Sequence, residues 1–193
     1  ILQNFLIIFQ PVLPLSSLMA WMDLLESSGV DPSLLSDMNK DVNRLSVIAE
    51  RFSKIGSKPE MELIYVNEVL ENATEYMRRR VSDKVLITTH LPSDAEGAMV
   101  CLSLFEWVIE NLCKNAVDAM NGEGRIDVYM TSEKQQIYID IKDTGKGIAR
   151  KNFKTVFNPG YTTKKRGWGL GLTLAKRIIE DYHAGRILSL IHI

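Results

Sequence analysis

Apolar residues recur at helical spacing along residues 14–56 and predict two helices. Pro14 suits a first helical turn, and the apolar residues that follow it at this spacing are Leu15, Leu18, Met19, Met22 and Leu25. After a turn at 29–32, a second stretch places on one face Leu34, Met38, Val42, Leu45, Ile48, Phe52 and Ile55. Two amphipathic helices bury little surface alone, so they pack either on a second copy, as a four-helix bundle, or on the rest of the same chain.

The segment from Gly56 to Pro59 (GSKP) is the clearest boundary, and beyond it the pattern changes to mixed α and β. The helices expected there are 66–81, 104–120 and 172–182, and the strands are 84–90, 125–131 and 136–143. Isoleucines at 137, 139 and 141 alternate onto one face of the last strand. The short link 132–134 then predicts an antiparallel hairpin, and the chain as a whole reads as α+β.

Composition narrows the possible classes of protein. With 46% hydrophobic and 24% charged residues among 193, the chain is neither disordered throughout nor of low complexity. Its net charge of −1 argues against nucleic acid as a partner. Cys101 and Cys113 lack the spacing of a metal cluster and indicate buried thiols. The apolar start Ile1–Phe9 is too short to span a membrane; it is either a buried helix start or the end of a longer membrane segment.

The helix predicted over 104–120 has a polar face. Asn111, Asn115 and Asp118 recur at positions i, i+4 and i+7, while small residues such as Ala116 and Ala119 let the helix lie close to a sheet. Two carboxamides and a carboxylate supply oxygen ligands for a hard cation that keeps some of its waters, as Mg²⁺ does. The alternative for this motif alone is a solvated polar face.

A second motif, 143–148 (DTGKGI), follows directly after the last predicted strand. The carboxylate of Asp143 can accept a hydrogen bond from the exocyclic amine of a base. Gly145 and Gly147 permit positive φ and a close backbone approach to a ligand. A simple turn is the alternative.

A third motif, 167–172 (GWGLGL), precedes the last predicted helix. Glycines before a helix start expose backbone N–H groups, which together with the helix dipole can hold phosphate. The spacing is neither that of the dinucleotide motif, because position 172 is Leu, nor that of a P-loop. The basic run 164–166 (KKR) can neutralise phosphate charge, or it is an exposed basic loop.

In this order and spacing, the three motifs resemble the N, G1 and G2 boxes of the GHKL ATP-binding superfamily. That superfamily includes gyrase-type topoisomerases, a heat-shock chaperone family, mismatch-repair ATPases and sensor histidine kinases. The run 157–164 (FNPGYTTK) resembles the F-box and lid of the kinases, so over residues 10–187 the chain resembles a sensor histidine kinase of two-component systems. The implied fold is a two-layer α/β sandwich of the GHKL (Bergerat) type, preceded by an antiparallel helical hairpin that dimerises as a four-helix bundle.

The resemblance implies an ATP site with Mg²⁺ held by Asn115, phosphates near Asn111 and Lys114, and the adenine amine on Asp143. The full set of implied nucleotide-binding residues is Asn111, Lys114, Asn115, Asp118, Asp143, Gly145, Gly147, Ile148, Thr162, Thr163, Lys164, Gly167, Gly169, Leu170, Gly171 and Leu172. Hydrolytic members of the superfamily have a general-base Glu where this chain has Asn111. Because Asn cannot take a proton from water, phosphoryl transfer to a protein side chain is expected instead.

The implied activity is that of a protein histidine kinase, which transfers the γ-phosphoryl of ATP to a His and then to an Asp of a response-regulator receiver domain. The implied assembly is a homodimer through the N-terminal helices. The implied location is the cytoplasmic region of a bacterial inner-membrane receptor, attached to the membrane only through upstream segments. Two alternatives are a non-catalytic ATP-binding dimerisation switch (a pseudokinase) and a GHKL ATPase.

The chain departs from the family at both ends. The expected phosphoacceptor position holds Phe9, and Pro11 would disrupt the helix that presents it, so no catalytic residue is assigned. Either the kinase is degenerate or the first dozen residues are a corrupted reading; the good match from Pro14 onward favours the second. Residues 188–193 (LSLIHI) resemble the translation of a transposon-end adapter and are expected to be non-native. The expected domains are therefore a hairpin over 1–56 and a truncated ATP-binding domain over 57–187, with an exposed sheet edge.

Overall fold

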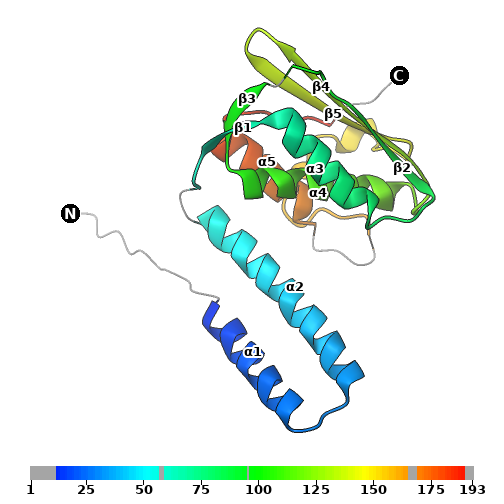
Figure 1. Cartoon of the computed structure of the whole chain (residues 1–193). Helices are drawn as coiled ribbons and strands as arrows, with labels where there is room; N and C mark the ends of the chain where they lie inside the picture. The colour runs from blue at the N-terminus through cyan, green and yellow to red at the C-terminus, as the bar shows by residue number, and fades with distance from the viewer. Residues whose placement is uncertain (1–11, 57–58, 95, 165–168, 190–193) are drawn as a thin grey trace. The chain divides into compact units, whose positions relative to one another are not determined.

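The computed structural model describes residues 12–56, 59–94, 96–164 and 169–189, and the chain divides into two compact units, 1–59 and 60–193 (Figure 1). Phe9, Pro11, Gly167 and the basic residues at 165 and 166 lie outside the described residues.

The first unit is a helical hairpin of α1 (Val12–Ser27) and α2 (Pro32–Gly56). Gly29 turns the chain with a φ of 77°. The Oδ1 atom of Asp31 accepts a hydrogen bond from the backbone N–H of Ser33 at 2.8 Å and so caps α2. This bond, with a second from the Ser33 hydroxyl, holds the pKa of Asp31 below its usual value. The predicted helices and the turn between them are thus present.

Among the side chains of the hairpin that the structure describes, few of the large apolar ones are buried. Met22, Leu35 and Val42 are buried, whereas the exposed set is Leu18, Met19, Trp21, Leu24, Leu34, Met38 and Leu45. Of the face predicted on the second helix, the side chains at 48, 52 and 55 lie outside the described residues. Within the described part of the chain, no helix has both the length and the apolar character needed to cross a membrane.

The second unit has two sheets and one layer of helices (Figure 1). The larger sheet has the order β2-β4-β5, with β2 (Val85–His90) parallel to β4 (Gly124–Glu133) and β4 antiparallel to β5 (Gln136–Asp143). The smaller sheet pairs β1 (Glu62–Tyr65) with β3 (Gly97–Val100). The main helices are α3 (Val66–Arg78), α4 (Leu102–Ala119) and α5 (Gly171–Arg177).

The core lies between the larger sheet and the helices α3 and α4. Ile126, Val128 and Met130 alternate to the inner face of β4, and they pack with buried residues of both helices such as Leu70 and Ile109. The predicted isoleucines of β5 are partly buried against the same core. Both cysteines are buried free thiols, and burial raises the pKa of Cys113 to about 11, which keeps this thiol protonated and inert.

Three features differ from the sequence prediction. The strands β1 and β3 were not predicted, because their four residues contain only two periods of alternation. The β4–β5 link is a two-residue turn at Lys134 and Gln135, with φ values of 51° and 64°. The strand β4 therefore extends to Glu133, into the predicted link, whereas β5 begins at Gln136 as predicted. The last helix ends as a π-turn over Ile178–Tyr182, which a 3.6-residue pattern cannot distinguish from an α-helix.

The free edge of β2 is covered by a charged network from α3. The Arg78 guanidinium donates from Nε to the carbonyl of Ile87 at 3.0 Å and from Nη1 to Glu71 at 3.0 Å. A hydrogen bond from the Thr89 hydroxyl to Glu71, followed by that from Arg78, holds the pKa of Glu71 below its usual value. This contribution to stability is therefore present at neutral pH and is lost as the pH falls through the lowered pKa.

His183 joins the end of the last helix to the start of α4. Its Nε2 accepts a hydrogen bond from the backbone N–H of Cys101 at 3.0 Å, and its Nδ1 lies 2.8 Å from the carbonyl oxygen of Ile178. This pattern requires the neutral tautomer with the proton on Nδ1. The same bond satisfies an N–H at the start of the helix that bears the polar face.

Replacing His183 with Phe is expected to lower the free energy of unfolding by about 1–3 kcal/mol, because it leaves the Cys101 N–H buried without a partner. Urea denaturation measures this change. Because Gln keeps an acceptor oxygen, His183→Gln should lose less stability than His183→Phe. Equal stability of the Phe variant and the parent chain would contradict the assigned bond.

Candidate functional site

The predicted polar face of α4 is present. Asn111 and Asn115 are half-buried and Asp118 is exposed, while Cys113 and Ala116 on the other side are buried in the core. The helix thus lies with its apolar side on the sheet and presents two carboxamides and a carboxylate on its open side. Lys114, on the same helix, is exposed.

The loop that contains the F-box-like run lies against this polar face. The Nζ atom of Lys164 donates to Asn115 Oδ1 at 2.7 Å and to Asp118 Oδ2 at 2.6 Å. The backbone N–H of Lys164 donates to Thr162 Oγ1 at 3.1 Å, which fixes the turn that presents the lysine. Thr162 and Thr163 are both exposed beside it.

The 143–148 loop closes on the C-terminal end of α4. The Oδ1 atom of Asp143 accepts a hydrogen bond from the Gly145 N–H at 2.8 Å, and the Lys146 N–H donates to the Ala119 carbonyl at 3.2 Å. A Cβ atom on Gly145 would lie 2.8 Å from Ala119 Cβ, so only glycine fits there. Gly147 instead has a φ of 66° with open space around it. Ile148 is 39% exposed at the end of the loop.

The glycine-rich start of α5 contacts the other end of the same polar face. A Cβ atom on Gly171 would lie 2.5 Å from Asn111 Oδ1, so the helix backbone packs directly on this carboxamide. Gly169 has a φ of 64°, and its carbonyl accepts a hydrogen bond from the Gly160 N–H at 3.1 Å. The adjacent Leu170 and Leu172 are half-buried.

The three motifs therefore meet along one helix: Asn111 contacts the start of α5, Asn115 contacts the 158–164 loop, and Ala119 contacts the 143–148 loop. Residues that meet here are up to 60 positions apart in the sequence, as Asn111 and Gly171 are. The structure also has an unpredicted contact in which the Thr173 hydroxyl donates to the Phe157 carbonyl at 3.0 Å. A hydroxyl residue in the first turn of the last predicted helix was the only sequence signal for it.

The residues at this site fit a nucleotide with its metal ion. Asn111 Nδ2 is buried and has no hydrogen-bond partner among the described residues, so it can donate to a phosphate oxygen. Asn115 and Asp118 already direct oxygens at a cation, the Lys164 ammonium. No three His, Cys, Asp or Glu side chains converge within the described ranges. A Mg²⁺ ion at Asn115 would therefore draw other ligands from phosphate and water.

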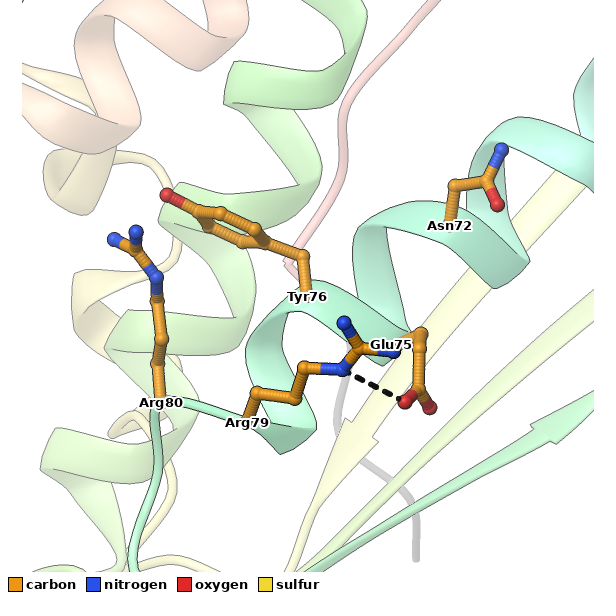
Figure 2. Close-up of a pocket in the computed structure, with 5 residues that line it drawn as sticks. All are labelled: Asn72, Glu75, Tyr76, Arg79 and Arg80. Atoms are coloured by element: carbon orange, nitrogen blue, oxygen red, sulfur yellow. Dashed lines mark hydrogen bonds and ion pairs between the residues drawn. The ribbon is translucent and has the colours of Figure 1, made fainter.

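A separate hollow lies on the outer side of α3 (Figure 2). Arg80 places its guanidinium carbon 4.0 Å from the centroid of the Tyr76 ring, and Arg79 pairs with Glu75 at 3.2 Å. Asn72 completes the lining. Both arginines are thus already engaged, and none of the predicted site residues lies in this hollow.

Comparison with known families matches residues 102–189 to the family described as "Histidine kinase-, DNA gyrase B-, and HSP90-like ATPase". The signal transduction histidine-protein kinase AtoS of Escherichia coli is 28% identical over 187 residues, which are 92% of this chain and 30% of AtoS. Sporulation kinase A of Bacillus subtilis is 39% identical over 75 residues, or 39% of this chain and 12% of that kinase. The chain thus spans less than a third of the length of these two relatives.

The fold of this chain is similar to the folds of solved histidine kinase structures. The catalytic domain of histidine kinase ThkA matches with a TM-score of 0.63 at 22% identity, covering 69% of this chain and 89% of that domain. Full-length ShkA in complex with AMPPNP matches with a TM-score of 0.71 at 19% identity, covering 87% of this chain and 38% of ShkA. The predicted two-layer α/β sandwich of the GHKL type is confirmed.

Proposed function

Because residues 102–189 belong to the histidine kinase-, gyrase- and HSP90-like ATPase family, we propose that this chain is the ATP-binding core of a sensor histidine kinase. The observation that supports this most is the meeting of three motifs along α4, where the buried Nδ2 atom of Asn111 has no hydrogen-bond partner among the described residues and Asn115 directs an oxygen at a cation. The reaction is transfer of the γ-phosphoryl of ATP to a protein His and then to an Asp of a response regulator.

The adenine binds at the 143–148 loop in this proposal. The turn at Asp143 uses Oδ1 to accept the Gly145 N–H, which orients the carboxylate so that Oδ2 can accept the exocyclic amine. Gly145 allows the loop backbone to approach Ala119, and Gly147 leaves open space beside the base. Ile148 offers an exposed apolar surface to the ring.

The triphosphate lies along the polar face of α4. Asn115 would hold Mg²⁺, and a bound Mg²⁺ would supply positive charge beside the phosphates. Asn111 Nδ2 and Lys114 donate to the phosphates, with Asp118 beside them. The residues that cover the phosphates are Thr162, Thr163, Lys164, Gly169, Leu170, Gly171 and Leu172, together with Gly167 outside the described residues.

The side chains at the site favour transfer over hydrolysis. The position of a general-base Glu is held by Asn111, which cannot take a proton from water. His183 has both ring nitrogens engaged, and His90 stacks on Tyr129 on the outer side of the sheet, so neither is a suitable phosphoacceptor. The expected acceptor position is Phe9, and we therefore expect nucleotide binding without self-phosphorylation.

The helical hairpin of α1 and α2 is the proposed dimerisation element. The exposed apolar set on α1 and α2 supports a homodimer through a four-helix bundle, since a second copy would cover these side chains. A response-regulator receiver domain is the proposed protein partner. In this proposal the chain comes from the cytoplasmic region of a bacterial inner-membrane receptor.

Incubation with ATP labelled at the γ-phosphate tests the proposed reaction. The chain is expected to bind Mg·ATP and to acquire no acid-labile label, because no acceptor imidazole stands at Phe9. The combined Phe9→His and Pro11→Ala variant is expected to gain label. Acid-labile label on the parent chain would contradict the proposal.

The same assay separates the alternatives. Binding without label even after the acceptor is restored would favour a non-catalytic ATP-binding switch. Steady release of inorganic phosphate would instead favour a GHKL ATPase, despite the missing carboxylate at Asn111.

A further inference from the structure

The Lys164 ammonium lies where a metal ion is expected. It is 2.7 Å from Asn115 Oδ1 and 2.6 Å from Asp118 Oδ2, two oxygens that come from residues 49 and 46 positions away in the sequence. The Lys164 and Asp118 side chains are 39% and 43% exposed, so a cation from solution can reach them. Both oxygens are of the type that a hard divalent cation prefers.

Asn115 Oδ1 cannot serve both cations in this arrangement. A Mg²⁺ ion binds its oxygens at about 2.1 Å, so it would have to enter the space next to the ammonium. Two positive charges within a few ångströms repel strongly at a partly buried site. Binding of the metal at Asn115 therefore requires Lys164 to leave.

We propose that Lys164 is a built-in competitor for the divalent cation: its ammonium fills the metal position in the nucleotide-free chain and is displaced when the metal binds. This inference rests on the proposed function, because Asn115 is the metal ligand of the nucleotide site. The displaced ammonium is then available to the phosphates. The concentration of Mg²⁺ that the site requires is thus set in part by the strength of the Lys164 pair.

An ordinary surface ion pair would not have this effect. Such pairs join two side chains and leave the ligand positions of a site free, as Lys40 does with Asp37 on α2 at 2.9 Å. Lys164 differs because it bridges the carboxamide assigned to the metal and the neighbouring carboxylate. Its turn is also fixed by the hydrogen bond to Thr162 Oγ1.

Titration of the nucleotide-free chain with Mn²⁺ tests the competition, with free Mn²⁺ followed by electron paramagnetic resonance. Lys164→Met is expected to tighten Mn²⁺ binding about fivefold, the effect of removing a competing ion pair. Lys164→Arg keeps the charge and should remain close to the parent. Lys40→Met removes the same charge and breaks an exposed ion pair on α2, and it should leave Mn²⁺ binding unchanged.

Unchanged or weaker Mn²⁺ binding by Lys164→Met, in a variant that melts like the parent, would overturn the proposal. A second titration, with AMPPNP at saturating MgCl₂, tests the proposed function separately. If the parent chain does not bind AMPPNP at saturating MgCl₂, the assignment of the nucleotide site is wrong. The Mn²⁺ titration would still report whether Lys164 competes with a cation at Asn115 and Asp118.

Discussion

Replacing Asp143 with Asn is expected to weaken ATP binding about 100-fold while leaving the fold intact. The new side chain keeps Oδ1, so the bond from the Gly145 N–H at 2.8 Å and the turn of the loop survive. It replaces Oδ2 by an NH₂ group, which would face the exocyclic amine of adenine with a second donor. Calorimetric titration with AMPPNP and MgCl₂ measures the loss.

Asp140→Asn is the matched control for this prediction. Asp140 lies on the same strand as Asp143, and its side chain alternates to the outer face of the sheet. The Asp140→Asn substitution removes the same charge as Asp143→Asn, and the affinity of this variant for AMPPNP should equal that of the parent chain. A drop of similar size in both variants, or in neither, would show that Asp143 does not bind the base.

Replacing Gly145 with Ala is expected to have the largest effect on stability, a loss of about 2–4 kcal/mol, together with loss of nucleotide binding. The added Cβ would lie 2.8 Å from both the backbone carbon and the Cβ of Ala119 and 2.7 Å from Asp143 Oδ1. Because the backbone of α4 cannot give way as a flexible side chain would, the loop must move. Thermal unfolding and AMPPNP titration measure the two consequences.

Gly147→Ala separates crowding from backbone strain. Gly147 has a φ of 66°, and no atom lies within 4 Å of the added Cβ. The Gly147→Ala substitution should therefore lower the free energy of unfolding only by the strain of the left-handed backbone, about 1–2 kcal/mol. If Gly145→Ala proved no more destabilising than Gly147→Ala, the close packing of the 143–148 loop on α4 would be refuted.

The residues of the candidate site could be proposed from the sequence because they are grouped in three short motifs. Asn111, Asn115 and Asp118 share a face through helical periodicity alone, and the structure confirms this face. The β4–β5 hairpin followed equally from the alternation of isoleucines. Such signals are local, so a pattern within one element is sufficient to reveal them.

The contacts between motifs could not be predicted in this way. The bond from Lys164 to Asn115 depends on how a loop 49 residues later lies on α4, and no local pattern encodes that placement. The strands β1 and β3 pair across more than 30 residues and are only four residues long. The hydrogen bond of the His183 imidazole could not be predicted for the same reason, because its partner, the N–H of Cys101, is 82 residues away in the sequence.

The nucleotide site along α4 is tested most directly by amide chemical shifts of the ¹⁵N-labelled chain, recorded with and without AMPPNP and MgCl₂. The largest shifts are expected at Asn115, Gly145 and Gly171, which come from three separate motifs. Shifts confined to the hollow around Tyr76 and Arg80, or no shifts at millimolar nucleotide, would contradict this expectation.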